Sequence, residues 1–186
     1  MTRHFLRDDD LSPDEQVVKP YIDFERAGVA QLDTSQGLMV KNWRLWLEDG
    51  RKVMLQPDGG AAVMLFEDSG LTEVSFTFDQ NMRWSAAYLR FGVLTLRWYD
   101  SLVSNHVVSS FGPGRCPRLT LDDKRNENLG NSDVIFAYIK GDDLCYRQQR
   151  DRYLVERVLK AGLYPGTRLR GIGMNKNLRL QFELVE

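Results

Sequence analysis

The sequence predicts a mainly β protein with antiparallel, blade-like sheets, arranged as an open β-sandwich or a partial β-propeller. An N-terminal arm with one short helix is expected before it. Three observations predict this fold: apolar and polar residues alternate over long stretches, turn residues interrupt the chain often, and one pattern repeats within the chain. We divide the chain into an arm, residues 1–36, and a β-repeat domain, residues 37–186.

The arm contains a helix-start pattern, because Ser12 can cap a helix that has Pro13 at its first position and Glu15 three residues after the cap. Pro20 ends this helix within two turns. The arm also carries more apolar residues than a free tail would. We therefore expect it to dock on another subunit or another protein as an assembly clamp, through Phe5, Leu11, Tyr21 and Phe24.

The first strands are expected on both sides of Glu48-Asp49-Gly50, because Asp-Gly favours a tight hairpin turn. A third strand is expected within residues 61–70. Residues 71–100 alternate most clearly, with Val74, Phe76 and Phe78 on one face of a strand. A break rich in glycine and proline, residues 111–118, is expected before the next block of strands.

The internal repeat aligns residues 78–100 with residues 121–151, with the copies spaced by 43 to 50 residues. That spacing is typical of a four-stranded propeller blade. The alignment makes Tyr88 equivalent to Tyr138 and Leu94 equivalent to Leu144. It also predicts a turn at Asp142-Asp143, equivalent to the turn at Phe91-Gly92 in the first copy of the repeat. A fainter earlier copy would place Trp46 near Tyr88 and Leu55 near Leu96.

Composition excludes several classes of function. The chain has 25 basic and 26 acidic residues, and this balance argues against a protein whose main task is to bind DNA or an anionic membrane. No apolar run approaches the roughly 20 residues that span a bilayer, and the first residues lack the apolar core of a signal peptide. We therefore expect synthesis in the cytoplasm and no membrane span.

Catalytic and metal sites are not expected, and neither is a cofactor. The two cysteines, Cys116 and Cys145, and the two histidines lack zinc-ligand spacing or a nucleophile motif. We expect both cysteines to be unpaired thiols.

Four arginines gather in residues 147–157, and we name them the arginine cluster: Arg147, Arg150, Arg152 and Arg157. The acidic residues Asp151 and Glu156 lie among them. A nucleic-acid groove would more often leave its arginines unpaired and add lysines. We therefore interpret the cluster as paired charges on the surface or at a subunit interface, and nucleic-acid contact remains a less favoured alternative.

The blade-like segments "VSFTFDQN", "SDVIFAYIKGDDLCYRQQRDRY" and "GIGMNKNLRLQFEL" resemble a recurring module of tailed-bacteriophage virion proteins, over residues 71–186. The resemblance implies a non-catalytic structural part of the tail, at a tail tip, nozzle, baseplate or fibre attachment. It also implies location in the virion, with copies of the chain and other tail proteins as partners.

A glycan-binding or glycan-hydrolysing β module at a tail tip is the alternative. Such a site needs two carboxylates that flank the sugar and aromatic platforms beneath it. Asp122, Asp123 and Asp133 could supply the carboxylates, and Trp84 and Trp98 the platforms. However, Trp98 alternates with core leucines, and Asp122 recurs at a turn position of the repeat, which favours structural roles.

Overall fold

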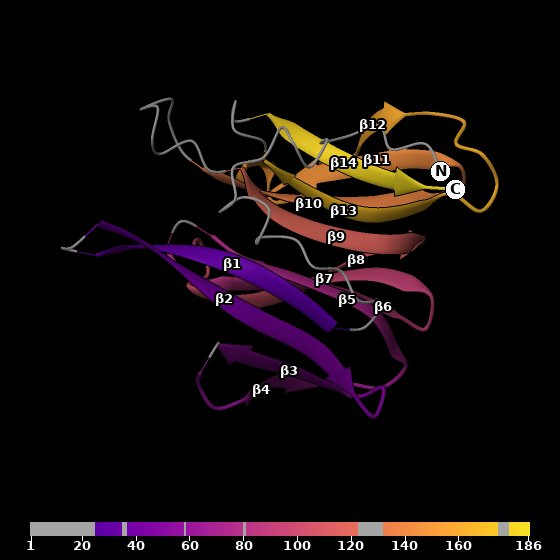
Figure 1. The fold of residues 1–186 in the computed structure, drawn as a ribbon. Coiled ribbons are helices and arrows are strands. Elements are labelled where there is room, and N and C mark those ends of the chain that lie inside the picture. The colour runs from indigo at the N-terminus through magenta and orange to yellow at the C-terminus, as the bar shows by residue number, and fades with distance from the viewer. Residues whose placement is uncertain (1–24, 35–36, 58, 80, 123–131, 175–178) are drawn as a thin grey trace.

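The computed structural model describes residues 25–34, 37–57, 59–79, 81–122, 132–174 and 179–186, and most of these lie in antiparallel strands (Figure 1). The strands form four sheets. Sheet 1 contains β1 (Glu25–Thr34), β2 (Gly37–Glu48), β3 (Lys52–Pro57) and β4 (Val63–Glu67); sheet 2 contains β5 (Leu71–Phe78), β6 (Trp84–Arg90), β7 (Val93–Asp100) and β8 (Asn105–Pro113); sheet 3 contains β9 (Arg115–Asp122), β10 (Asp133–Lys140), β11 (Asp143–Gln148) and β12 (Arg157–Lys160); sheet 4 contains β13 (Arg168–Met174) and β14 (Leu180–Val185). The predicted fold class, mainly β with blade-like antiparallel sheets, is confirmed.

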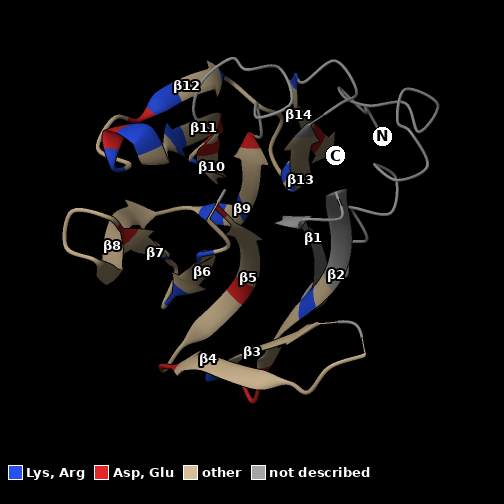
Figure 2. Ribbon diagram, turned by 90° about the vertical axis from the view of Figure 1, so that its left-hand side faces the viewer, with Lys and Arg blue, Asp and Glu red and all other residues tan. Residues whose placement is uncertain are grey.

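The sheets pack face to face in chain order. One hydrophobic cluster, with Leu45 and Phe76, joins sheet 1 to sheet 2, and a second, with Leu96 and Phe136, joins sheet 2 to sheet 3. A third joins sheet 3 to sheet 4. The first strands β5, β9 and β13 lie beside one another, while β4, β8 and β12 lie at the outer edges of their sheets (Figure 2). This arrangement resembles successive propeller blades, in which sheets 2 and 3 bury both faces and sheets 1 and 4 lie at the ends of the stack.

The predicted repeat is confirmed between sheets 2 and 3. Tyr88 lies opposite Thr95 in the β6–β7 hairpin, and Tyr138 lies opposite Cys145 in the β10–β11 hairpin. Both tyrosines are buried against the preceding sheet. The two central hairpins therefore have one register, and Cys145 occupies an ordinary strand position.

The repeat extends to an irregularity that the sequence did not reveal. The pairing of β5 with β6 and that of β9 with β10 shift at the same place, where Glu73 and Cys116 have positive φ values of 49° and 55°. Pro117 follows Cys116 in this bulge, where a missing N–H does not interrupt the pairing. The Cys116 N–H donates a 2.9 Å hydrogen bond to the Glu73 carboxylate, so equivalent bulges in neighbouring sheets bind each other.

Sheet 1 is the fainter copy that the sequence indicated. Trp46 lies opposite Met54 in sheet 1, just as Tyr88 lies opposite Thr95 in sheet 2. The neighbouring pair also matches, because Leu55 lies opposite Leu45 and Leu96 lies opposite Ala87. The predicted equivalence of Trp46 with Tyr88 is therefore confirmed.

Three predicted boundaries differ from the structure. The hairpin turn of sheet 3 is Gly141-Asp142, because Asp143 already pairs with Lys140; glycine at the first turn position accepts the positive φ of 57°. The expected break at residues 111–118 is largely strand, since β8 ends at Pro113 and β9 begins at Arg115.

The third difference concerns the arm. The predicted boundary at residue 36 falls within a hairpin, because β1 pairs with β2 over its whole length. Residues 25–34 therefore belong to sheet 1, although their alternation is too weak to predict a strand. The predicted helix at residues 13–19 lies outside the described residues.

Candidate functional site: the arginine cluster

The arginine cluster surrounds a strained turn between β11 and β12. The chain leaves β11 through a short 3-10 helix, Gln149–Asp151, and then passes through Arg152 and Tyr153 with positive φ values of 56° and 60°. Two successive left-handed residues other than glycine cost on the order of 1–3 kcal/mol each and persist only where surrounding contacts hold them. One such contact is the Tyr153 ring, which is buried edge-on against Trp98, with the ring centroids 5.1 Å apart.

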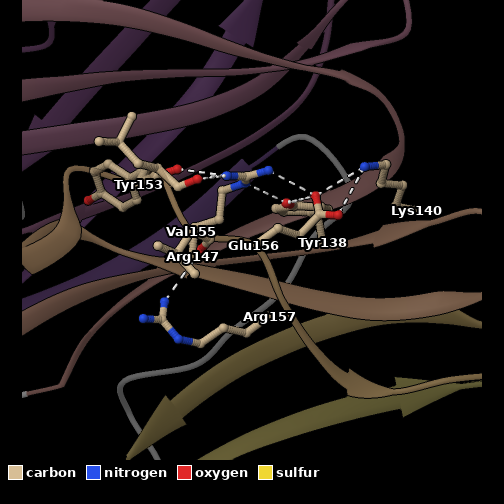
Figure 3. A network of polar contacts seen from close by, with 8 residues as sticks. Tyr138, Lys140, Arg147, Tyr153, Val155, Glu156 and Arg157 are labelled. Carbon is tan, nitrogen blue, oxygen red and sulfur yellow. Dashed lines mark hydrogen bonds and ion pairs between the residues drawn. The ribbon is translucent and has the colours of Figure 1, made fainter.

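Arg147 is the main polar support of this turn (Figure 3). Its Nη1 donates to the backbone carbonyls of Tyr153 at 2.8 Å and Leu154 at 3.1 Å. Its Nε donates to the Tyr138 hydroxyl at 2.7 Å, and its Nη2 donates to the Glu156 carboxylate at 3.0 Å. Only 12% of the side chain is exposed, so these bonds form largely away from water.

Arg147 also belongs to the repeat. Its guanidinium carbon lies 4.7 Å from the ring centroid of Phe111, on the last strand of sheet 2. The equivalent residue of sheet 2, Arg97, lies 4.4 Å from the ring centroid of Phe66, on the last strand of sheet 1. Each of these arginines therefore stacks on an aromatic ring of the preceding sheet, and the cation–π contact is a repeated inter-sheet lock.

The polar network around Arg147 fixes the charge of its members. Burial raises the pKa of Tyr138, and the hydrogen bond that its hydroxyl donates to Glu156 raises it further. Burial alone would raise the pKa of Glu156, but hydrogen bonds from Tyr138, Lys140 and Arg147 outweigh this and hold that pKa below its usual value. At neutral pH Tyr138 is therefore a neutral donor, and Glu156 is an anion between two cations.

The other three arginines are each paired with a carboxylate. Arg157 Nη1 contacts Asp151 at 2.7 Å, Arg150 Nε lies 3.5 Å from Asp133, and Arg152 bonds Asp100 on β7 of sheet 2. The last two carboxylates are buried, whereas 69% of the Arg150 side chain and 48% of the Arg152 side chain are exposed. The pairs are therefore neutral in sum but present guanidinium groups to solvent.

Asp133 is a buried carboxyl of this region with a raised pKa. Burial raises its pKa, and the negative charges of Asp122 and Asp151 add to that increase, while the Arg150 backbone N–H and guanidinium oppose it. Asp133 lies directly opposite Asp122 between β10 and β9, and one of its oxygens has no hydrogen-bond partner in the described structure. The Arg150 guanidinium is therefore paired with a carboxylate whose ionisation is disfavoured by burial.

The arginine cluster is stabilised by internal ion pairs and hydrogen bonds. Each of its four arginines contacts a carboxylate, and within the described residues no group of three or more His, Cys, Asp or Glu could hold a metal ion. Cys116 and Cys145 are buried free thiols, and burial raises the pKa of the Cys145 thiol, which disfavours a reactive thiolate. In the described part of the chain, no helix is long and apolar enough to cross a membrane.

The residues considered for a glycan site are placed otherwise. Trp98 is buried and donates a hydrogen bond to Ser109 at 3.1 Å, and Trp84 is stacked between Phe66 and His106. Neither ring is open as a sugar platform. Asp123 lies outside the described residues.

The structure brings the four predicted arginines into one region but does not test their predicted interface role, which stays a prediction. Phe5, Leu11, Tyr21 and Phe24 lie outside the described residues. Sequence reasoning missed Tyr153 and Asp100 and named Tyr138 only as a repeat position; the partners of these residues are up to 55 residues away in sequence. Only the recurrence of a tyrosine at the position of Tyr88 could have singled out Tyr138.

Comparison with protein-family models, curated proteins and solved structures finds no match to this chain.

Proposed function

We propose that this chain is a non-catalytic structural component of a bacteriophage tail, which assembles with further copies of itself and with other tail subunits. The proposal joins the resemblance of residues 71–186 to the arrangement of the sheets. One observation carries the assembly part of the proposal. The residue at one repeat position is buried between sheets in sheets 2 and 3, but its equivalent in sheet 1 lies outside the hydrophobic clusters of the described residues.

That position is held by Tyr88 in sheet 2 and by Tyr138 in sheet 3, both buried against the sheet before. In sheet 1 it is held by Trp46, which is outside the hydrophobic clusters formed by the described residues. Trp46 lies opposite Met54, and Met54 lies opposite Met64, so the three side chains form an apolar row across sheet 1. An apolar row at a position built for sheet stacking favours contact with another protein surface.

Sheet 4, at the opposite end of the stack, has a different outer face. On β13 and β14, the side chains that face sheet 3 are apolar, such as Ile172 and Phe182. The alternate positions carry Gly171, which lies opposite Glu183, and Arg170 contacts Glu183 at 3.5 Å. The outer positions of β14 therefore carry the polar residues Gln181 and Glu183, as a terminal repeat does, which favours sheet 1 as the end suited to further stacking.

Native mass spectrometry of the full chain tests this proposal. The wild-type protein is expected to form a discrete oligomer, and Met64→Glu, which places a charge in the apolar row, is expected to dissociate it. Val108→Glu is the matched control, because Met64 and Val108 are 53% and 52% exposed and Val108 lies on sheet 2. A monomeric wild-type protein, or equal dissociation by both variants, would contradict the proposal.

A further inference from the structure

A second apolar surface lies at the other side of the molecule, on the edge of sheet 3. We define the edge patch as the five exposed apolar residues between positions 154 and 164: Leu154, Val155, Val158, Leu159 and Tyr164. Leu154 and Tyr164 are 77% and 73% exposed. Strand β12 is the outermost strand of this sheet and is only four residues long. A short apolar edge strand is a surface on which an extended segment can dock.

A pocket of about 280 Å³ adjoins the edge patch. Tyr164 belongs to both, and Leu163 and Leu184 supply apolar walls. Thr167 also lines the pocket; it is 2% exposed, and its hydroxyl oxygen has no hydrogen-bond partner in the described structure. A buried hydroxyl without a partner costs about 1–3 kcal/mol. The pocket is therefore suited to an apolar side chain that ends in a hydrogen-bonding group.

The charged groups beside the edge patch indicate which kind of segment can bind there. The exposed guanidinium groups of Arg150 and Arg152 face solvent, whereas their carboxylate partners are buried. An acidic segment is therefore favoured at this surface over a basic one.

Residues 1–24 of this chain have the required chemistry. They contain six acidic and three basic residues, and five of the acidic residues precede an apolar stretch with Val17, Val18 and Ile22. They also contain one tyrosine, Tyr21, whose ring and hydroxyl match an apolar pocket with a buried hydroxyl. Twenty-four residues reach at most about 80 Å when extended, enough to connect two molecules.

We propose that residues 1–24 of a second copy of this chain dock on the edge patch, with Tyr21 in the pocket and its hydroxyl bonded to Thr167. The inference rests on the proposed function, since it adds a second contact between copies to the one at the apolar row of sheet 1. It makes the edge patch the receiving site of each subunit.

Photochemical cross-linking of the full chain tests the inference. Tyr164 is replaced by p-benzoylphenylalanine, and equal amounts of unlabelled and ¹⁵N-labelled protein are mixed before irradiation. The expected products are mixed-isotope dimers whose cross-links lie within residues 1–24. The matched control carries the same group at Leu102, which is 75% exposed in the turn between β7 and β8, and it should give few such products.

Two variants refine the test. Thr167→Val keeps the shape of the side chain but removes its hydroxyl, and it should weaken self-association roughly two- to tenfold, as expected for one hydrogen bond. Tyr21→Phe should weaken it by a similar factor and should have no additional effect in the Thr167→Val background.

Each outcome has one meaning. Cross-links found only inside single molecules, without mixed-isotope dimers, would overturn docking by a second copy. Cross-links to any segment other than residues 1–24 would show that these residues do not occupy the edge patch. An oligomer that persists in native mass spectra without these cross-links would reject the edge patch but leave the proposed function intact. A monomer would reject both.

Discussion

Replacement of Arg147 by methionine tests the inter-sheet lock most sharply. Methionine preserves much of the apolar stem but removes four hydrogen bonds, to Tyr138, Glu156 and two backbone carbonyls, together with the stacking on Phe111. The Leu154 carbonyl can bind water instead, because that residue is exposed, and Glu156 keeps Lys140 at 2.9 Å.

The expected cost is therefore below that of a fully buried broken ion pair. The buried Tyr153 carbonyl and the weakened Glu156 pair cost about 2 kcal/mol, and the lost cation–π contact adds about 1 kcal/mol. A loss of about 3 kcal/mol should lower Tm by roughly 6–12 °C in a protein of this size.

Arg97→Met is the matched control. Arg97 holds the equivalent position and stacks on Phe66, but within the described residues its side chain makes no hydrogen bond or ion pair. Its loss should cost only about 0.5–1 kcal/mol. Urea unfolding followed by tryptophan fluorescence measures both variants. The reasoning is refuted if Arg147→Met is as stable as Arg97→Met, because the polar network would then contribute nothing beyond the repeated stacking.

Further predictions concern the bulge, the repeated core and the pH dependence. Glu73→Ala should destabilise the protein by about 1–3 kcal/mol because the Cys116 N–H loses its acceptor, and Glu73→Gln, which keeps an acceptor, should cost clearly less in urea unfolding. Leu94→Ala and Leu144→Ala remove equivalent buried side chains, so each should cost about 2–5 kcal/mol; a large difference between them would contradict the structural equivalence of the two sheets. Because the pKa of Glu156 is lowered in the folded state, its stabilising contribution is present above the unfolded pKa of about 4.3 and is lost as the pH falls through the lower folded pKa. Glu156→Gln should therefore be less stable than wild type at neutral pH, with a gap that narrows in acid, and a gap that does not depend on pH would count against this assignment.

The sequence predicted the parts of the fold that depend on local alternation. The faces of residues 71–100 and the equivalence of Tyr88 with Tyr138 were correct because a strand repeats its side-chain direction every two residues. The identical spacing of apolar residues around two hairpins determined their register.

The remaining features depend on contacts between segments that are distant in sequence. β1 has little alternation of its own and exists as a strand by pairing with β2. The bulge at Glu73 and Cys116 is stabilised by a hydrogen bond between two sheets, and Asp100 reaches Arg152 across 52 positions. Local propensity contains no information about such pairs, so the residues of the arginine cluster could be named but their partners could not.

Localisation of the chain in assembled particles tests the central claim most directly. Phage particles would be purified from cells infected by the phage that encodes this chain, and the chain would be measured by quantitative mass spectrometry and located by gold-labelled antibodies in electron micrographs. The structural proposal predicts a fixed number of copies per particle, with gold at the tail. Its absence from purified particles, with the protein remaining in the soluble fraction of the lysate, would contradict the claim.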